Sequence, residues 1–407
     1  MASPAKSSQV KGNSRTFMWE GSKAVAEFVK LCKPNVISAY PITPQTHIVE
    51  NLAQIVADGE LKTEFVNVES EHSAASVVLG ASATGARTYT ATTSQGFLLM
   101  LEVLYNIAGL RLPVSLTCAN RSVSAPINIW NDHQDAVTAR DSGWIQVFAE
   151  NNQEASDMQI QAYKIGEDKD IMLPVMVCMD GFVLTHAYEP VSVPDQKDVD
   201  AFLPPYRPKY YLTTKNPLTI GAMVGPERYM EMRYQIQQTM ELAKDKIEGV
   251  ANDFREKFGR YYGGLIDKYR ADDAETLLVG MGSMVGTMKD VVDKLRSKGG
   301  KIGVVKVRAF RPFPKERLHE TLKGAKNLII FEKAISLGKG GILCSEIKSI
   351  FDAKSRNAPS NISNFIIGLG GRDITESSIL GAVEQAEKQP VELGFVDLDK
   401  ELLSGGD

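Results

Sequence analysis

The sequence predicts an α/β protein with two doubly wound parallel sheets. Between Val36 and Gln134, four short β-rich runs each break into a turn or a helix start, and from Glu275 the same alternation resumes over a shorter stretch. Strands that alternate with helices are typical of parallel sheets whose crossover helices cover both faces. The length of 407 residues also exceeds what one hydrophobic core usually supports.

Composition argues against several classes of protein. The chain is 43% hydrophobic and 24% charged, and its net charge of −4 provides no basic field for nucleic acid or an anionic membrane. We find no long apolar span and no apolar signal core, so we expect a cytoplasmic protein. The cysteines Cys32, Cys118, Cys178 and Cys344 are far apart and follow no ligand spacing. We therefore expect no metal site in this chain.

The first unit is expected to begin with a helix from Glu20 to Leu31, which Pro34 ends. A strand from Val36 to Tyr40 follows. Pro44 can occupy the first position of the next helix. This arrangement leaves Thr43 at the turn between the strand and that helix.

The second unit combines a strand from Phe65 to Val68 with a helix that starts near Glu71. Ser70 is the expected N-cap, which places Glu71 in the first turn, where the helix dipole favours a carboxylate. A purely structural glutamate fits this position equally well, so the pattern alone leaves its role open.

Two further units follow, a strand from Thr88 to Thr93 with the turn Ser94-Gln95-Gly96, and a strand from Val114 to Thr117 leading to Arg121. Arg121 could be a solvated strand end, part of an ion pair, or a planar fork for a substrate carboxylate. The polar cluster from Asn131 to Asp135 begins another helix. Composition alone favours capping and loop ordering for it.

The rest of the chain continues the alternation. Strands are expected at Trp144 to Ala149 and Leu173 to Met179, with a helix between them, and the Gly280 to Gly286 turn follows a later strand. That turn lacks the third glycine of a nucleotide fingerprint, which favours helix–strand packing. The predicted parts are a flexible arm (1–15), a first domain (16–225) with an extended proline- and tyrosine-rich segment (190–222), a helical linker (226–270), a second domain (271–390) and a tail (391–407).

Seven motifs in order carry a family resemblance: YPITP from Tyr40, ESEHSA from Glu69, TTSQG from Thr92, ANR ending at Arg121, NDHQD from Asn131, DGF from Asp180 and RPFP from Arg311. With these, residues 18 to 387 resemble the alpha subunit of the multi-subunit pyruvate:ferredoxin oxidoreductase family of 2-oxoacid oxidoreductases. The resemblance implies a thiamine diphosphate pyrimidine-binding domain followed by a transketolase C-terminal-like domain.

The resemblance also implies an activity and partners. Members oxidatively decarboxylate a 2-oxo acid to acyl-CoA and CO2, and iron–sulfur subunits pass the electrons to ferredoxin or a similar acceptor. The sequence contains neither the diphosphate–magnesium motif nor cluster cysteines. We therefore expect beta-, gamma- and delta-type subunits to hold the magnesium, the diphosphate and the clusters.

Matching the family motifs gives roles to individual residues. Glu71, with Glu69 as the competitor, is expected to bind the cofactor's pyrimidine, Arg121 the substrate carboxylate, and Thr43 to donate a hydrogen bond. Ser94 and Gln95 are expected in the cofactor loop, and Asp132, His133 and Asp135 chiefly to order the loop of Arg121. The expected substrate pocket comprises Tyr40, Pro41, Ile42, Thr43, Arg121, Asp132 and His133.

Thr43 fits the pattern for monocarboxylic 2-oxo acids, so pyruvate is the expected substrate. The same frame also fits branched-chain or aromatic acids such as 2-oxoisovalerate and phenylglyoxylate. A lipoate-linked dehydrogenase or transketolase-like subunit would lack the YPITP, NDHQD and RPFP set. A non-catalytic assembly subunit is disfavoured because Thr43, Glu71 and Arg121 are present together.

Overall fold

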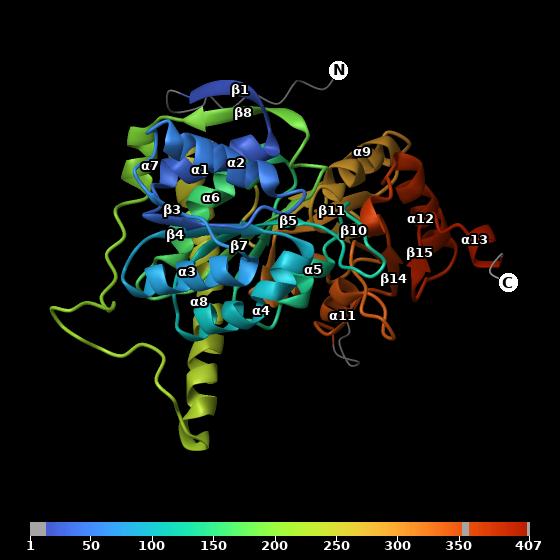
Figure 1. The fold of residues 1–407 in the computed structure, drawn as a ribbon. Coiled ribbons are helices and arrows are strands. Elements are labelled where there is room, and N and C mark those ends of the chain that lie inside the picture. Colours follow the sequence, from blue (N-terminus) through green and yellow to red (C-terminus); the bar gives the residue numbers. More distant parts are fainter. Residues whose placement is uncertain (1–13, 352–357, 405–407) are drawn as a thin grey trace.

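The computed structural model describes residues 14–351 and 358–404, and its two large sheets confirm the α/β fold class (Figure 1). The first sheet has the strand order β12-β6-β7-β5-β4-β2-β3. All its strands are parallel except β12, which runs antiparallel to β6. The strands are β2 (Val36–Ser38), β3 (Glu64–Val66), β4 (Thr88–Thr92), β5 (Ser115–Asn120), β6 (Ile145–Phe148), β7 (Val175–Asp180) and β12 (Ala309–Arg311).

Helices cover both faces of the first sheet (Figure 1). One face carries α1 (Gly21–Cys32), α2 (Thr46–Ala57) and α6 (Asn152–Gly166), and the other carries α3 (Glu71–Ala83) and α4 (Ser94–Gly109). The strand order reverses between β2 and β4, because the chain winds from β2 to β3 on one side and from β4 to β5 on the other. Open α/β sheets bind ligands at such a reversal, outside the carboxyl ends of the strands.

The second sheet has the order β15-β14-β13-β10-β11-β9, and only β9 is antiparallel to its neighbour. Helices α9 (Met284–Arg296) and α12 (Glu376–Lys388) cover one face, and α10 (Lys315–Leu322) and α11 (Ile342–Lys348) lie on the other. The strands are β9 (Ile266–Tyr269), β10 (Thr276–Gly280), β11 (Ile302–Val307), β13 (Asn327–Glu332), β14 (Asn361–Ile366) and β15 (Gly394–Phe395).

The two sheets share a hydrophobic core. One buried cluster contains Phe97 and Phe148 of the first sheet's layers together with Val305 of β11 and Phe310 of β12. Such burial contributes about 1.5–3 kcal/mol for each large apolar side chain. The two layers are therefore packed together as one body.

The remaining elements lie around these sheets. The antiparallel pair β1 (Ser14–Glu20) and β8 (Tyr188–Pro194) packs beside α1, and α7 (Gln196–Phe202) follows β8. The C-terminal half of α8 (Pro226–Phe258) enters the core, whereas its N-terminal half projects from the body with Tyr229 and Met230 exposed (Figure 1). In the described ranges, no helix is long and apolar enough to span a membrane.

The structure differs from the sequence analysis in several places. The second helix begins at Thr46 and not at Pro44, because Gln45 closes a turn onto the carbonyl of Ile42 (2.8 Å) and anchors its side chain to the carbonyl of Ala91 (2.7 Å). The segment 190–222, expected to be extended, contains α7.

Three strands lie in parts of the chain where the sequence predicted a linker, a tail or a different sheet. β9 lies within the expected linker and β15 within the expected tail, and β12 joins the first sheet. Of the expected arm, residues 1–13 lie outside the described residues, and Ser14 begins β1. The domain limits stay predictions.

A buried ionic network joins α6 to the second sheet. Glu154 pairs with Lys306 (3.1 Å) and with Arg308 (3.2 Å), and all three side chains are almost fully buried. Lys306 also reaches Glu150 (3.1 Å), and Arg308 donates to Gln161 (2.9 Å). Buried charges tolerate the loss of a partner poorly, because the remaining charges stay desolvated.

We expect Glu154→Ala to lower the free energy of unfolding by about 3 kcal/mol, because two buried cations would lose a counter-charge. Urea titration of the purified chain measures this loss. The control is Asp272→Ala, which removes an exposed ion pair with Lys268 and should cost less than about 1 kcal/mol. Equal losses for the two variants would contradict a stabilising role for the network.

Candidate active site

The carboxyl ends of four neighbouring strands place the expected site residues at one edge of the first sheet. Thr43 follows β2, Glu71 follows β3, Ser94 follows β4 and Arg121 follows β5. This edge is also where the strand order reverses. The structure therefore brings these four residues to the same side of the molecule.

Glu71 occupies the first turn of α3, as the sequence indicated. The hydroxyl of Ser70 caps this helix by accepting from the backbone N–H of Ser73 (3.2 Å). The Glu71 side chain is 7% exposed, yet it makes no hydrogen bond to any described residue. It packs on Gly96, where an added Cβ would lie 2.4 Å from its Oε1. Glu69, by contrast, is exposed and accepts from the hydroxyl of Ser73.

The turn before α4 has an unusual backbone. Ser94 has a φ of 48°, and its N–H donates to Asp135 (3.0 Å) while its hydroxyl donates to the carbonyl of Ser122. The amide nitrogen of the Gln95 side chain is buried and has no hydrogen-bond partner among the described residues. A buried donor without a partner is costly unless a ligand or water satisfies it.

Asp135 holds this turn and the Arg121 backbone together. Its fully buried carboxylate accepts from the N–H groups of Ser94 and Arg121 (both 3.0 Å) and from the side-chain amide of Asn120 (2.9 Å). Burial raises the pKa of Asp135, and these hydrogen bonds oppose that rise. A single carboxylate thus fixes the relative positions of the loops after β4 and β5.

Part of the Arg121 guanidinium is hydrogen-bonded to the backbone of this chain. Its Nη1 donates to the carbonyl of Thr43 (2.8 Å), and its Nε donates to the carbonyl of Asn128 (3.0 Å). Its Nη2 donates to no described residue. Burial lowers the pKa of Arg121, and the charge of Asp135 opposes this shift. The guanidinium is therefore held in place with one nitrogen left for an anionic ligand.

The YPITP loop forms an open rim beside Arg121. Tyr40 is 37% exposed, Pro41 and Thr43 are exposed, and Ile42 is half-buried. The Thr43 hydroxyl has no partner among the described residues. These side chains can line a substrate pocket, but this chain alone does not enclose it.

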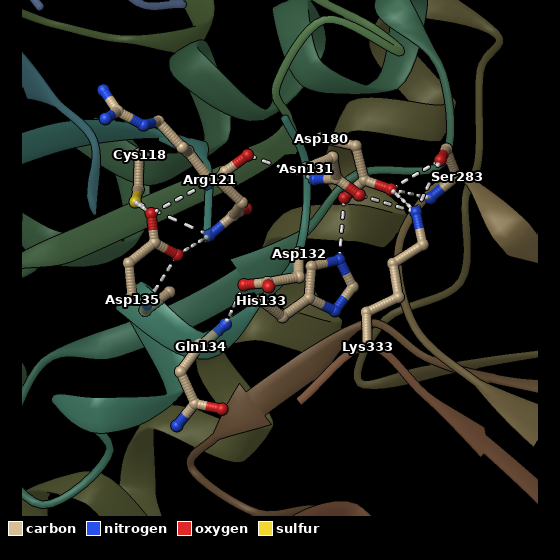
Figure 2. Close-up of polar contacts among 12 residues, drawn as sticks. Cys118, Arg121, Asn131, Asp132, His133, Gln134, Asp135, Asp180, Ser283 and Lys333 are labelled. Atoms are coloured by element: carbon tan, nitrogen blue, oxygen red, sulfur yellow. Dashed lines mark hydrogen bonds and ion pairs between the residues drawn. The ribbon is translucent and has the colours of Figure 1, made fainter. Parts of the chain in front are cut away.

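Asp132 and His133, which are expected in the substrate pocket, are both buried in this chain. His133 is fully buried and its Nε2 contacts Asp180 (2.7 Å) (Figure 2). Asp132 accepts from the N–H groups of Gln134 (3.0 Å) and Gly370 (3.3 Å), and burial raises its pKa to about 6. Loops of the second sheet contact both side chains, through Gly370 at Asp132 and through Gly282 at the His133 ring.

Asp180 and Lys333 form the centre of this contact, which sequence reasoning missed (Figure 2). Lys333 Nζ contacts Asp180 (2.7 Å) and the side-chain oxygen of Asn131 (2.7 Å). Burial opposes ionisation of Asp180, but Lys333 and His133 hold its pKa well below the usual range. The sequence signals were the position of Asp180 directly after an expected strand and its place at the start of the DGF motif.

The glycine-rich turn before α9 also binds the carboxylate of Asp180. Ser283 donates to Asp180 from its backbone N–H (3.1 Å) and its hydroxyl (2.5 Å). Gly282 packs against His133, where an added Cβ would lie 2.8 Å from the ring. A protein carboxylate therefore fills the turn that a nucleotide phosphate would need, which supports the packing interpretation.

Other features of the structure lie away from this edge. A cavity of about 820 Å³ lies between α8 and the second sheet, and its lining includes Glu248, Arg317 and the edge strand β9. It contacts none of the expected site residues. Within residues 14–351 and 358–404, no group of three or more His, Cys, Asp or Glu side chains could hold a metal ion.

Two family models match most of the chain. Residues 27–252 match the pyruvate flavodoxin/ferredoxin oxidoreductase, thiamine diphosphate-binding family, and residues 274–379 match pyruvate:ferredoxin oxidoreductase core domain II. Together these matches cover all the expected site residues.

Two curated relatives align over nearly the whole chain. A pyruvate synthase subunit PorA of Methanosarcina barkeri is 55% identical over 94% of this chain and 97% of its own length. A ketoisovalerate oxidoreductase subunit VorA of Pyrococcus abyssi is 42% identical over 94% of this chain and 95% of its own length.

A solved structure shares the fold. The 2-oxoglutarate:ferredoxin oxidoreductase of Magnetococcus marinus has a TM-score of 0.70 and 19% identity; the alignment covers 92% of this chain and 65% of that longer chain. At 19% identity this likeness shows only a shared fold. The family models and the curated relatives show the family. The chain therefore belongs to the pyruvate:ferredoxin oxidoreductase family of 2-oxoacid oxidoreductases, among its alpha subunits.

Proposed function

We propose that this chain is the alpha subunit of a thiamine diphosphate-dependent, CoA-acylating 2-oxoacid oxidoreductase. In the overall reaction, a 2-oxo acid anion and CoA give acyl-CoA, CO2, a proton and an electron pair, which passes to ferredoxin or a similar acceptor. One observation carries the proposal. The buried Glu71 side chain and Arg121 Nη2, neither of which has a hydrogen-bond partner among the described residues, lie at the same edge of the sheet.

The residues around Glu71 fit an aminopyrimidine. Glu71 offers a buried acceptor and Gln95 a buried donor, and neither has a partner within the described chain. Gly96 leaves space beside the carboxylate that any larger residue would fill. Glu71 would accept a hydrogen bond from the pyrimidine N1′ and thereby hold a proton there.

Thiamine diphosphate, when bound, supplies a carbon nucleophile that attacks the ketone of a 2-oxo acid. Arg121 holds the substrate carboxylate through Nη2, because Nη1 and Nε already donate to the carbonyls of Thr43 and Asn128. The exposed hydroxyl of Thr43 can donate to the same carboxylate or to the ketone oxygen.

Partner subunits supply the rest of the site. The described residues offer no metal-holding group, and the YPITP rim is open to solvent. We therefore assign magnesium, the diphosphate and the iron–sulfur clusters to partner subunits of the same complex. Relatives named as subunits at 42–55% identity support such an assembly.

Pyruvate is the proposed substrate. The relative from Methanosarcina barkeri, named for pyruvate, is more similar to this chain than the relative named for ketoisovalerate. The latter keeps a branched-chain 2-oxo acid as the second candidate. Both acids carry one carboxylate, which Arg121 Nη2 can bind because it has no partner among the described residues.

The assembled complex should reduce a low-potential acceptor when supplied with CoA and pyruvate. A panel of pyruvate, 2-oxoisovalerate, phenylglyoxylate and 2-oxoglutarate measures the specificity constant for each acid. A preference for a branched or aromatic acid would keep the mechanism and replace the substrate. Absence of activity with all four acids would support an assembly subunit without catalytic function.

Glu71→Gln should reduce kcat about 10²- to 10⁴-fold, which is the usual contribution of a group that handles a proton. The amide is similar in size to the carboxylate beside Gly96, so the complex should still assemble, as gel filtration would show. Glu69→Gln is the matched control and should retain activity, because Glu69 is exposed and bonded to Ser73. Normal turnover in Glu71→Gln would remove Glu71 from this role.

Arg121→Ala should raise the KM for the 2-oxo acid about 10- to 100-fold, since a hydrogen bond to a charged group contributes about 1.5–3 kcal/mol. Steady-state kinetics with each substrate varied in turn measures this change. The KM for CoA should stay unchanged. The KM of Arg121→Lys for the 2-oxo acid should lie between those of the unaltered complex and Arg121→Ala, because lysine keeps the charge but lacks the planar guanidinium. An unaltered KM for the 2-oxo acid would contradict carboxylate binding.

A further inference from the structure

A glycine turn of the second sheet supports the loop that holds Arg121. The turn follows β14 and contains Gly370 and Gly371, with φ angles of +61° and +81°. The side-chain amide of Asn128 donates to the carbonyl of Gly370 (3.0 Å), and the N–H of Gly371 donates to the carbonyl of Asn131 (2.7 Å). With the N–H of Gly370, which donates to Asp132 (3.3 Å), three hydrogen bonds thus cross between the sheets within one short turn.

Asn128 connects this turn to Arg121. Its backbone carbonyl accepts from Arg121 Nε (3.0 Å), and its side-chain oxygen accepts from the N–H of Trp130 (2.7 Å). The loop is closed by Ser122, whose N–H donates to the carbonyl of Trp130 (3.0 Å). The position of the guanidinium therefore depends on where Asn128 sits, and Asn128 rests on the second sheet.

A side chain at Gly370 or Gly371 would come very close to the 128–130 loop. An added Cβ at Gly370 would lie 2.7 Å from the Asn128 side-chain nitrogen, and one at Gly371 would lie 2.3 Å from the Cβ of Trp130. Both glycines also have a backbone conformation that side chains disfavour. A methyl group at Gly370 must displace the end of the Asn128 side chain, and one at Gly371 must displace Trp130 or the turn itself.

We propose that Gly370 and Asn128 are positioning residues for substrate binding, acting through the guanidinium of Arg121. This inference rests on the proposed function, in which Arg121 Nη2 binds the 2-oxo acid carboxylate. A shift of the loop by less than 1 Å would move that nitrogen away from the carboxylate, and misplacement of this order costs up to about 100-fold in rate. The second sheet thereby tunes substrate affinity without touching the substrate.

The test compares two glycines of the same turn in the assembled complex. Gly370→Ala pushes on Asn128 across the contact. Gly368→Ala is the matched control: Gly368 also has a positive φ (+68°), but its added Cβ would meet the side chain of Ile374 in the second sheet's own layers, at 2.7 Å. Both variants place alanine at a positive φ. They differ in whether the added methyl group contacts a residue of the 128–130 loop.

We expect Gly370→Ala to raise the KM for the 2-oxo acid about tenfold, with the KM for CoA unchanged and a loss of thermal stability similar to that of Gly368→Ala. Asn128→Ala should produce a similar rise, because it removes the same contact from the other side. The double variant should resemble Asn128→Ala alone, since the methyl group then has nothing to displace.

Arg121→Ala separates this inference from the proposed function. If Arg121→Ala raises the KM for the 2-oxo acid while Gly370→Ala and Asn128→Ala match Gly368→Ala, positioning by the second sheet is refuted and carboxylate binding stands. If Arg121→Ala leaves that KM unchanged, carboxylate binding by Arg121 is refuted, and the positioning role of Gly370 and Asn128 is refuted as well. Should Gly370→Ala not assemble, the KM of Asn128→Ala decides the question.

Discussion

The ion pair between Asp180 and Lys333 is the contact on which the arrangement of the two sheets depends. It joins the ends of β7 and β13 at 2.7 Å, deep inside the molecule, with His133, Asn131 and Ser283 completing the hydrogen bonds. A buried pair of this kind adds little net stability, because desolvation offsets the attraction, but it strongly disfavours any docking that leaves either charge alone. It therefore selects one relative orientation of the sheets.

The orientation matters because the loops at the candidate site are held from two directions. Asp135 ties the Ser94 turn to the Arg121 backbone from within the first sheet. The NDHQD segment and Asn128 meet the second sheet through Lys333 and Gly370. A charged ligand is bound most strongly by donors that need no rearrangement, and this double support supplies such rigidity.

Local signals in the sequence were sufficient for much of the fold and for the position of Glu71. The strand ends, the Ser70 cap and the first-turn carboxylate depend on neighbouring residues, and the family motifs identified the fold class. Contacts between distant segments could not be read this way. Lys333 lies 153 residues from Asp180, and the sequence does not show that the His133 side chain faces the second sheet rather than a pocket. The expected helix forms but begins at Thr46, two residues after Pro44, for the same reason, since Gln45 is anchored to the carbonyl of Ala91.

The strand β12 limits how the gene for such a chain can be divided or exchanged in parts between homologues. Residues 309–311 come from the C-terminal part of the sequence, yet they complete the first sheet by covering β6. Separating the chain into two genes upstream of residue 309 would leave β6 as an uncovered edge, and such edges recruit strands from other molecules. The two sheets are therefore not interchangeable modules. Exchange between homologous genes should preserve this strand together with the first sheet it covers.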